Sequence, residues 1–182
     1  MEANKVIKLG NPLLRLVSEP IANNEFGTDA LKTLANTLFD VMAQENGLGL
    51  AAPQIGINKR AIVFGMDKHP IHTELPPIPY TVLFNPSFVP TSDICVEDYE
   101  GCLSVGNLRG KVSRYKSIRY RGYDANGHLI EREVSDLHAR AVQHELDHLN
   151  GVIFLDRITN HSSLGFHEEL VLSGVLPSNM PD

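Results

Sequence analysis

The sequence predicts an α+β fold, in which strands fill the middle of the chain and helices flank them. Apolar residues recur every three or four positions across 29–46, which indicates an amphipathic helix. The segments 61–65 and 80–84 are β-prone runs, and 118–134 has the pattern of a hairpin with an Asn-Gly turn. A second helical pattern over 135–151 places two histidines on its apolar stripe.

Glycine, proline and polar residues mark the expected boundaries of these elements. Gly47 follows the first helical pattern and Gly151 follows the second, as helix stops do. Ser135 or Asp136 precedes the second pattern and can cap it. The proline-rich stretch 69–79 is expected to be a loop.

The composition predicts one folded domain over 1–182, with a C-terminal helix and tail in 158–182. A formal net charge of -6 at pH 7 disfavours nucleic acid and anionic lipid as partners, and no apolar run is long enough to span a membrane. The N-terminus lacks a signal peptide's apolar core, and two cysteines are too few for a disulfide framework. We therefore expect a cytoplasmic protein.

Residues 47–56 read GLGLAAPQIG. Gly47, Gly49 and Ala52 fit a dinucleotide-binding turn, and Asp67 lies where such turns have a ribose-binding acid. That turn must follow a strand and open a helix, whereas here a helix precedes the glycines and a proline follows them. We interpret the segment as a helix end and an extended loop whose glycines let backbone approach a ligand.

His144, Glu145 and His148 form an HExxH pattern on the second predicted helix. Residues four apart lie above one another on a helix, so both imidazoles can bind one cation while Glu145 reaches a water on it. HExxH also occurs by chance on exposed helices, but the position of both histidines on the apolar stripe argues against that origin.

A catalytic metal requires a third protein ligand, and the spacing leaves its identity open. A metzincin would have histidine where this chain has Phe154. Cys102 can supply a thiolate, whereas a thermolysin-like endopeptidase would use Glu168 or Glu169. Cys95 is expected to pack as a small buried residue, unless it closes a structural metal site as fourth ligand.

Three segments together resemble the signature motifs of the peptide deformylase family: GLGLAAPQ at 47–54, EGCLS at 100–104 and QHELDHLNG at 143–151. The resemblance covers nearly the whole chain. It implies an α+β fold with antiparallel strands in small sheets around a central HExxH helix, an N-terminal amphipathic helix and a C-terminal helix. It also implies a hydrolase that removes the formyl group from the N-terminal formyl-methionine of nascent polypeptides, with the tail after Ile158 as a candidate ribosome contact.

The resemblance makes Cys102, His144 and His148 the ligands of one divalent metal ion. It implies native Fe(II), for which Ni(II), Co(II) or Zn(II) can substitute. Metal-bound hydroxide would attack the formyl carbon, and Glu145 would be the general acid/base that passes the proton to the departing amine.

The resemblance also assigns substrate contacts. Gln54 and the backbone N–H of Leu103 would stabilise the oxyanion, and Gly49 would offer backbone hydrogen bonds to the peptide. An apolar pocket is expected to take the methionine side chain. Its expected lining residues are Leu48, Leu137 and Ala141.

Two positions depart from the family pattern. Gly106-Asn107 replaces the usual Pro-Gly, which predicts a more mobile loop, and Asp136 replaces a common glycine before the catalytic helix. Arg109 is expected to pair with Glu100. The departures bear on the substrate groove and leave the expected metal ligands unchanged.

Overall fold

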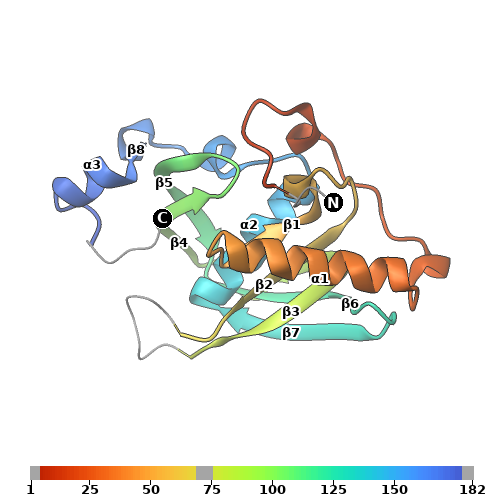
Figure 1. Cartoon of the computed structure of the whole chain (residues 1–182). Helices are drawn as coiled ribbons and strands as arrows, with labels where there is room; N and C mark the ends of the chain where they lie inside the picture. The colour runs from red at the N-terminus through yellow and green to blue at the C-terminus, as the bar shows by residue number, and fades with distance from the viewer. Residues whose placement is uncertain (1–4, 69–75, 178–182) are drawn as a thin grey trace.

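The computed structural model describes residues 5–68 and 76–177, and Figure 1 shows how their helices and strands are arranged. The α-helices are α1 (Asp29–Gln44), α2 (Asp136–Leu149) and α3 (His167–Leu172). The strands are β1 (Gly49–Ala51), β2 (Ala61–Met66), β3 (Ile78–Pro90), β4 (Cys95–Cys102), β5 (Gly106–Tyr115), β6 (Ser117–Tyr123), β7 (Leu129–Ser135) and β8 (Gly165–Phe166). The α+β class predicted from the sequence is confirmed.

Five antiparallel strands form the larger sheet, in the order β1-β2-β3-β6-β7. Alternate residues of β2 point to opposite faces, because successive side chains of a strand do so. Val63 packs in a core cluster with Leu38 of α1, whereas Phe64 packs in another with Leu146 of α2. This burial on both faces explains why β2 is a continuous apolar run.

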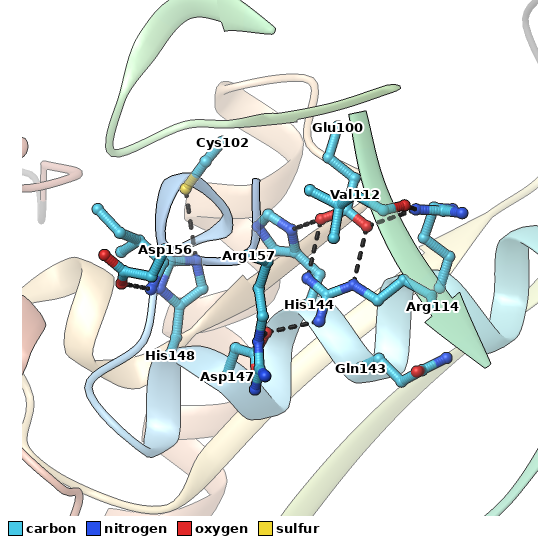
Figure 2. A network of polar contacts seen from close by, with 12 residues as sticks. Glu100, Cys102, Val112, Arg114, Gln143, His144, Asp147, His148, Asp156 and Arg157 are labelled. Carbon is cyan, nitrogen blue, oxygen red and sulfur yellow. Dashed lines mark hydrogen bonds and ion pairs between the residues drawn. The ribbon is translucent and has the colours of Figure 1, made fainter. Parts of the chain in front are cut away.

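The smaller sheet has the order β4-β5-β8, and although small antiparallel sheets were expected, these strands were not located in the sequence. Its strands β4 and β5 form a hairpin whose turn follows Cys102. The outer part of β4, from Cys95 to Asp98, is exposed along its whole length, so it lacks the alternation of buried apolar and exposed polar residues by which strands are recognised. The hairpin brings the thiol of Cys102 toward α2 (Figure 2).

The ends of the two long helices differ in detail from the predictions. The backbone after α1 takes the left-handed conformation at Asn46, with φ 54°, before Gly47 is reached. The Ser135 side chain makes no capping hydrogen bond, and Asp136 is itself left-handed, with φ 55°. Ser135 therefore holds the predicted N-cap position without the predicted hydrogen bond, and Asp136 begins the helix in a conformation that glycine reaches without strain.

The remaining expectations concern loops and the C-terminal segment. The Asn-Gly hairpin is confirmed, with β6 and β7 paired throughout and Gly127 at φ 86°. The expected loop over 69–79 falls partly outside the described residues, and β3 already begins at Ile78. A C-terminal helix is present as α3, a six-residue element. Within the described ranges, no helix is both long enough and apolar enough to cross a membrane.

His138 makes the stability of this fold depend on pH. Its ring lies 5.4 Å from that of Phe64 and 5.7 Å from that of Tyr120, and its Nε2 is buried with no hydrogen-bond partner in the described part of the chain. Burial, with a smaller contribution from the Arg132 cation, lowers the pKa of His138 to about 4. The unfolded chain, with a histidine pKa of about 6.5, therefore binds this proton more readily.

We expect neutral His138 to make its full contribution to the free energy of unfolding of the metal-free protein above about pH 6.5. This contribution should be lost as the pH falls toward 4. His138→Leu should make this fall less steep. Urea unfolding at several pH values between these limits measures both slopes. Equal slopes in the two proteins would show that His138 does not contribute.

Candidate metal centre and cleft

Three potential metal ligands converge from two elements. Cys102 ends β4, whereas His144 and His148 lie on successive turns of α2, and one ligand atom of each residue lies within 4.8 Å of the others. The Cys102 Sγ is 3.4 Å from the His148 Nε2 (Figure 2). A thiolate with two imidazoles suits a tetrahedral transition-metal site with one open position. The donor set therefore fits a catalytic divalent ion.

The electrostatics of the metal-free cluster favour a thiolate. Burial alone would raise the pKa of the Cys102 thiol, but the charges and hydrogen bonds of His148 and His144 outweigh burial and lower it. Burial likewise opposes the charge of His144, but Cys102 and Glu100 raise the pKa of its imidazole well above the ordinary value. A cation that binds here must replace the proton on His144.

Glu100 fixes the orientation of His144 from behind. Its Oε2 lies 2.9 Å from the His144 Nδ1, so Nδ1 donates to the carboxylate and Nε2 is left to face the cluster. Arg114 donates to both oxygens of Glu100 at 2.9 Å (Figure 2). Arg140 also donates to the Glu100 Oε1, at 2.8 Å. Burial opposes ionisation, but Arg114 and His144 outweigh it and hold the pKa of Glu100 far below its ordinary range.

The ion-pair network continues from Arg114 to the C-terminal side of α2. Arg114 also donates to Asp147 at 2.5 Å, and Asp147 accepts two hydrogen bonds from the half-exposed Arg157. Arg109, which was expected to pair with Glu100, donates to the carbonyls of Gly106 and Leu108. Its pairing with Glu100 stays a prediction.

Glu145 is buried beside the cluster. Desolvation is the main cause that raises the pKa of Glu145 to about 7, although the two histidines oppose it. Its Oε2 is buried and has no hydrogen-bond partner within residues 5–68 and 76–177. A Cβ atom at Gly49 would lie 2.5 Å from the Glu145 Oε1, so only glycine leaves room for this carboxyl group. The structure therefore gives Gly49 a steric role that the sequence did not reveal.

Gln54 points its amide group at the sulfur of Cys102. The Nε2 donates to the Cys102 Sγ at 3.5 Å and to the Ser104 hydroxyl at 3.2 Å, while the Oε1 accepts from the backbone N–H of Ala51 at 2.8 Å. The side chain is buried, and these contacts fix its rotamer. Its N–H groups are thus directed at the cluster.

An open cleft of about 1210 Å³ leads to this cluster. Several of the residues expected to contact substrate line it: Leu48, Gly49, Gln54, Leu103, Leu137 and Ala141. Leu103 begins the turn after β4, and its side chain packs against Gly47. At one wall, β1 is the edge strand of the larger sheet and pairs with β2 alone among the described strands.

The alternative third and fourth ligands lie elsewhere. Among the described residues, the metal-ligating group consists of Cys102 and the two histidines, without Glu168, Glu169 or Cys95. Glu168 instead accepts a hydrogen bond from Asn107 at 3.1 Å. Cys95 is exposed, so the expectation that it packs as a buried residue is wrong, because the outer end of β4 projects from the core.

The loop after Cys102 has a conformation that the family's proline could not adopt. Gly106 has φ 84°, whereas proline is fixed near −65°. The neighbouring Asn107 joins this loop to α3 through Glu168. Both Gly106 and Asn107 line the cleft, so the departure from the family pattern falls on its wall.

Comparison with known proteins gives a consistent result. Residues 3–163 match the family model described as polypeptide deformylase. Peptide deformylase 2 of Ralstonia nicotianae is 42% identical over 97% of this chain and 98% of that protein, and peptide deformylase 1 of Bordetella pertussis is 43% identical over 91% and 93%. A class I type b peptide deformylase from Acinetobacter baumannii, solved with Met-Ala-Ser bound, is similar in structure, with a TM-score of 0.80 and 36% sequence identity. The match covers 84% of this chain and 96% of that protein.

Proposed function

The chain belongs to the peptide deformylase family, and from that premise we propose that Cys102, His144 and His148 hold the metal ion at which it hydrolyses formyl groups. The chain is a hydrolase that acts on formyl-methionine peptides. The observation that carries the proposed site is the convergence of the three ligand atoms beside buried Glu145 in the cleft.

A divalent ion held by Cys102, His144 and His148 would supply Lewis acidity, which makes water a stronger acid and a better nucleophile at neutral pH. We propose Fe(II) as the native ion because the sequence resembles a family that uses it, and the thiolate and imidazole donors also accept Ni(II), Co(II) or Zn(II). Gln54 and Glu100 orient Cys102 and His144, respectively, toward the ion.

Glu145 moves the proton in this mechanism. Its buried carboxyl oxygen, which no described residue hydrogen-bonds, can accept a proton from the attacking water and deliver it to the amine that leaves with the peptide. In the metal-free site burial raises the pKa of Glu145, and the positive charge of a bound divalent ion would lower it again, so the carboxylate would be free to take up the proton. The products are formate and a free N-terminus.

Gln54 and the backbone N–H of Leu103 stabilise the oxyanion that develops on the formyl oxygen. Gln54 is held by Ala51 and Ser104, so its amide is already oriented before substrate binds. Leu103 follows the ligand Cys102 directly, which places its amide group next to the metal site.

The substrate chain lies along β1. An edge strand offers free backbone groups to an extended peptide, and Gly49 opens that edge to the cleft. Leu48, Leu137 and Ala141 then form the apolar wall that takes the methionine side chain. We place the reaction in the cytoplasm, on chains that emerge from the ribosome, with the segment after Ile158 as the candidate ribosome contact.

Release of formate from formyl-Met-Ala-Ser tests the proposal. Protein reconstituted with Ni(II) should release formate rapidly, and Cys102→Ser should lose both the bound metal and the activity because a ligand is removed. Glu168→Gln is the matched control, since Glu168 contacts Asn107 outside the ligand group. Metal retained in Cys102→Ser but lost in Glu168→Gln would instead indicate a thermolysin-like site.

A further inference from the structure

Arg140 is a buried arginine that has no role in the mechanism proposed above. It lies on α2, one turn before His144, and its side chain is 10% exposed. The guanidinium group makes three short contacts. Its Nη1 donates to the Glu100 Oε1 at 2.8 Å and to the Val112 carbonyl at 2.8 Å, and its Nη2 donates to the Val96 carbonyl at 2.7 Å.

The two carbonyl contacts join α2 to both strands of the smaller sheet. Val96 belongs to β4 and Val112 to β5, and β4 ends at the ligand Cys102. The three ligands therefore come from two elements that Arg140 connects directly. A metal site holds its ion tightly only when the ligands keep their positions to within about half an ångström.

The third contact of Arg140, with Glu100, acts on the histidine side of the site. Glu100 accepts from Arg114, Arg140 and the His144 Nδ1, so the orientation of the carboxylate depends on both arginines. Arg114 itself belongs to β5, which is the strand beside Glu100. Arg140 thus supplies a contact to Glu100 from the same helix that carries the histidines.

We propose that Arg140 is a positioning residue that sets metal affinity, by fixing α2 against the β4–β5 hairpin and by orienting Glu100 behind His144. This inference rests on the proposed ligand set of Cys102, His144 and His148. Arg140 acts through these neighbours and does not itself contact the ion. The affinity of the site for a divalent cation should therefore depend on the guanidinium group.

Arg140→Met tests this proposal, because methionine keeps a long apolar stem against the cleft and removes all three hydrogen bonds. Loss of a partner behind a ligand typically weakens metal binding about 10- to 100-fold, and we expect a rise of that size in the dissociation constant for Co(II), measured by competition with a chelator. The absorption of Co(II) bound to thiolate should also change. Arg119→Met is the matched control, since Arg119 is half-exposed and pairs with Glu133 on the far hairpin.

Arg140→Lys separates positioning from folding. Lysine keeps the charge near Glu100 but cannot donate to two carbonyls and a carboxylate in the fork geometry of arginine, so an intermediate affinity is expected. Urea unfolding of the metal-free variants identifies those that remain folded. If a folded Arg140→Met or Arg140→Lys protein binds Co(II) as tightly as wild type, the proposal is overturned. A Cys102→Ser protein that binds Co(II) as tightly as wild type would instead refute the ligand set.

Discussion

Glu145→Gln is expected to lower kcat by about two to four orders of magnitude, the usual contribution of a positioned general acid or base. Glutamine has the same shape, so it preserves the close packing against Gly49, but it cannot take up and return a proton. Metal content should be unchanged because Glu145 is not in the ligand group. Steady-state formate release by the Ni(II)-loaded variant, with metal quantified in the same sample, measures the effect.

The matched control for this prediction is Glu97→Gln, on the exposed outer part of β4. It should leave kcat and metal content at wild-type values. A Glu145→Gln enzyme that turns over at the wild-type rate would mean that another group moves the proton. Loss of the metal from Glu145→Gln would mean that the residue supports the ligands, and its proposed role would have to be abandoned.

Gln54→Leu is expected to lower kcat by about 10²- to 10³-fold with little change in KM, because one oxyanion donor typically contributes about 2.7–4 kcal/mol to the barrier. Leucine keeps most of the volume of the buried side chain and removes the amide that points at Cys102. Formate release at several substrate concentrations separates kcat from KM.

The same substitution leaves the Ala51 N–H without its side-chain partner. We therefore expect the free energy of unfolding to fall by about 1–3 kcal/mol, the usual penalty for an unsatisfied buried donor. Assays at a temperature where the variant remains folded keep the two effects apart. A fall in stability without a fall in kcat would show that Gln54 is structural only.

The sequence revealed the parts of the site that lie close together in the chain. HExxH spacing is visible because residues four apart share one face of a helix, and α2 and its histidines were placed from that rule alone. Cys102 comes from a distant hairpin, so spacing could not choose between it and Glu168. The choice required the resemblance of three motifs to a known family, and the structure then placed Cys102 beside His148.

The sequence did not reveal the buried ion pairs behind the ligands. Arginine and glutamate are usually assigned to the surface, because they are rarely buried without a partner. Here the partners that allow their burial are distant in the chain, so the sequence does not reveal them. One signal was present, since Arg140 follows Leu137 at helical spacing on the cleft-facing side of α2. The strand β4 was missed because its outer part is exposed and has no apolar face by which a strand can be recognised.

In the proposed binding mode, in which the substrate chain lies along β1, the edge position of this strand limits when the enzyme can act. A polypeptide can pair with this strand only while its own first residues have free backbone N–H and C=O groups. Once a client's N-terminus has entered a helix or sheet, those groups are occupied and the formyl group is out of reach. We therefore expect deformylation to compete with the folding of each client, and proteins whose first residues fold early to have the shortest time in which to be processed.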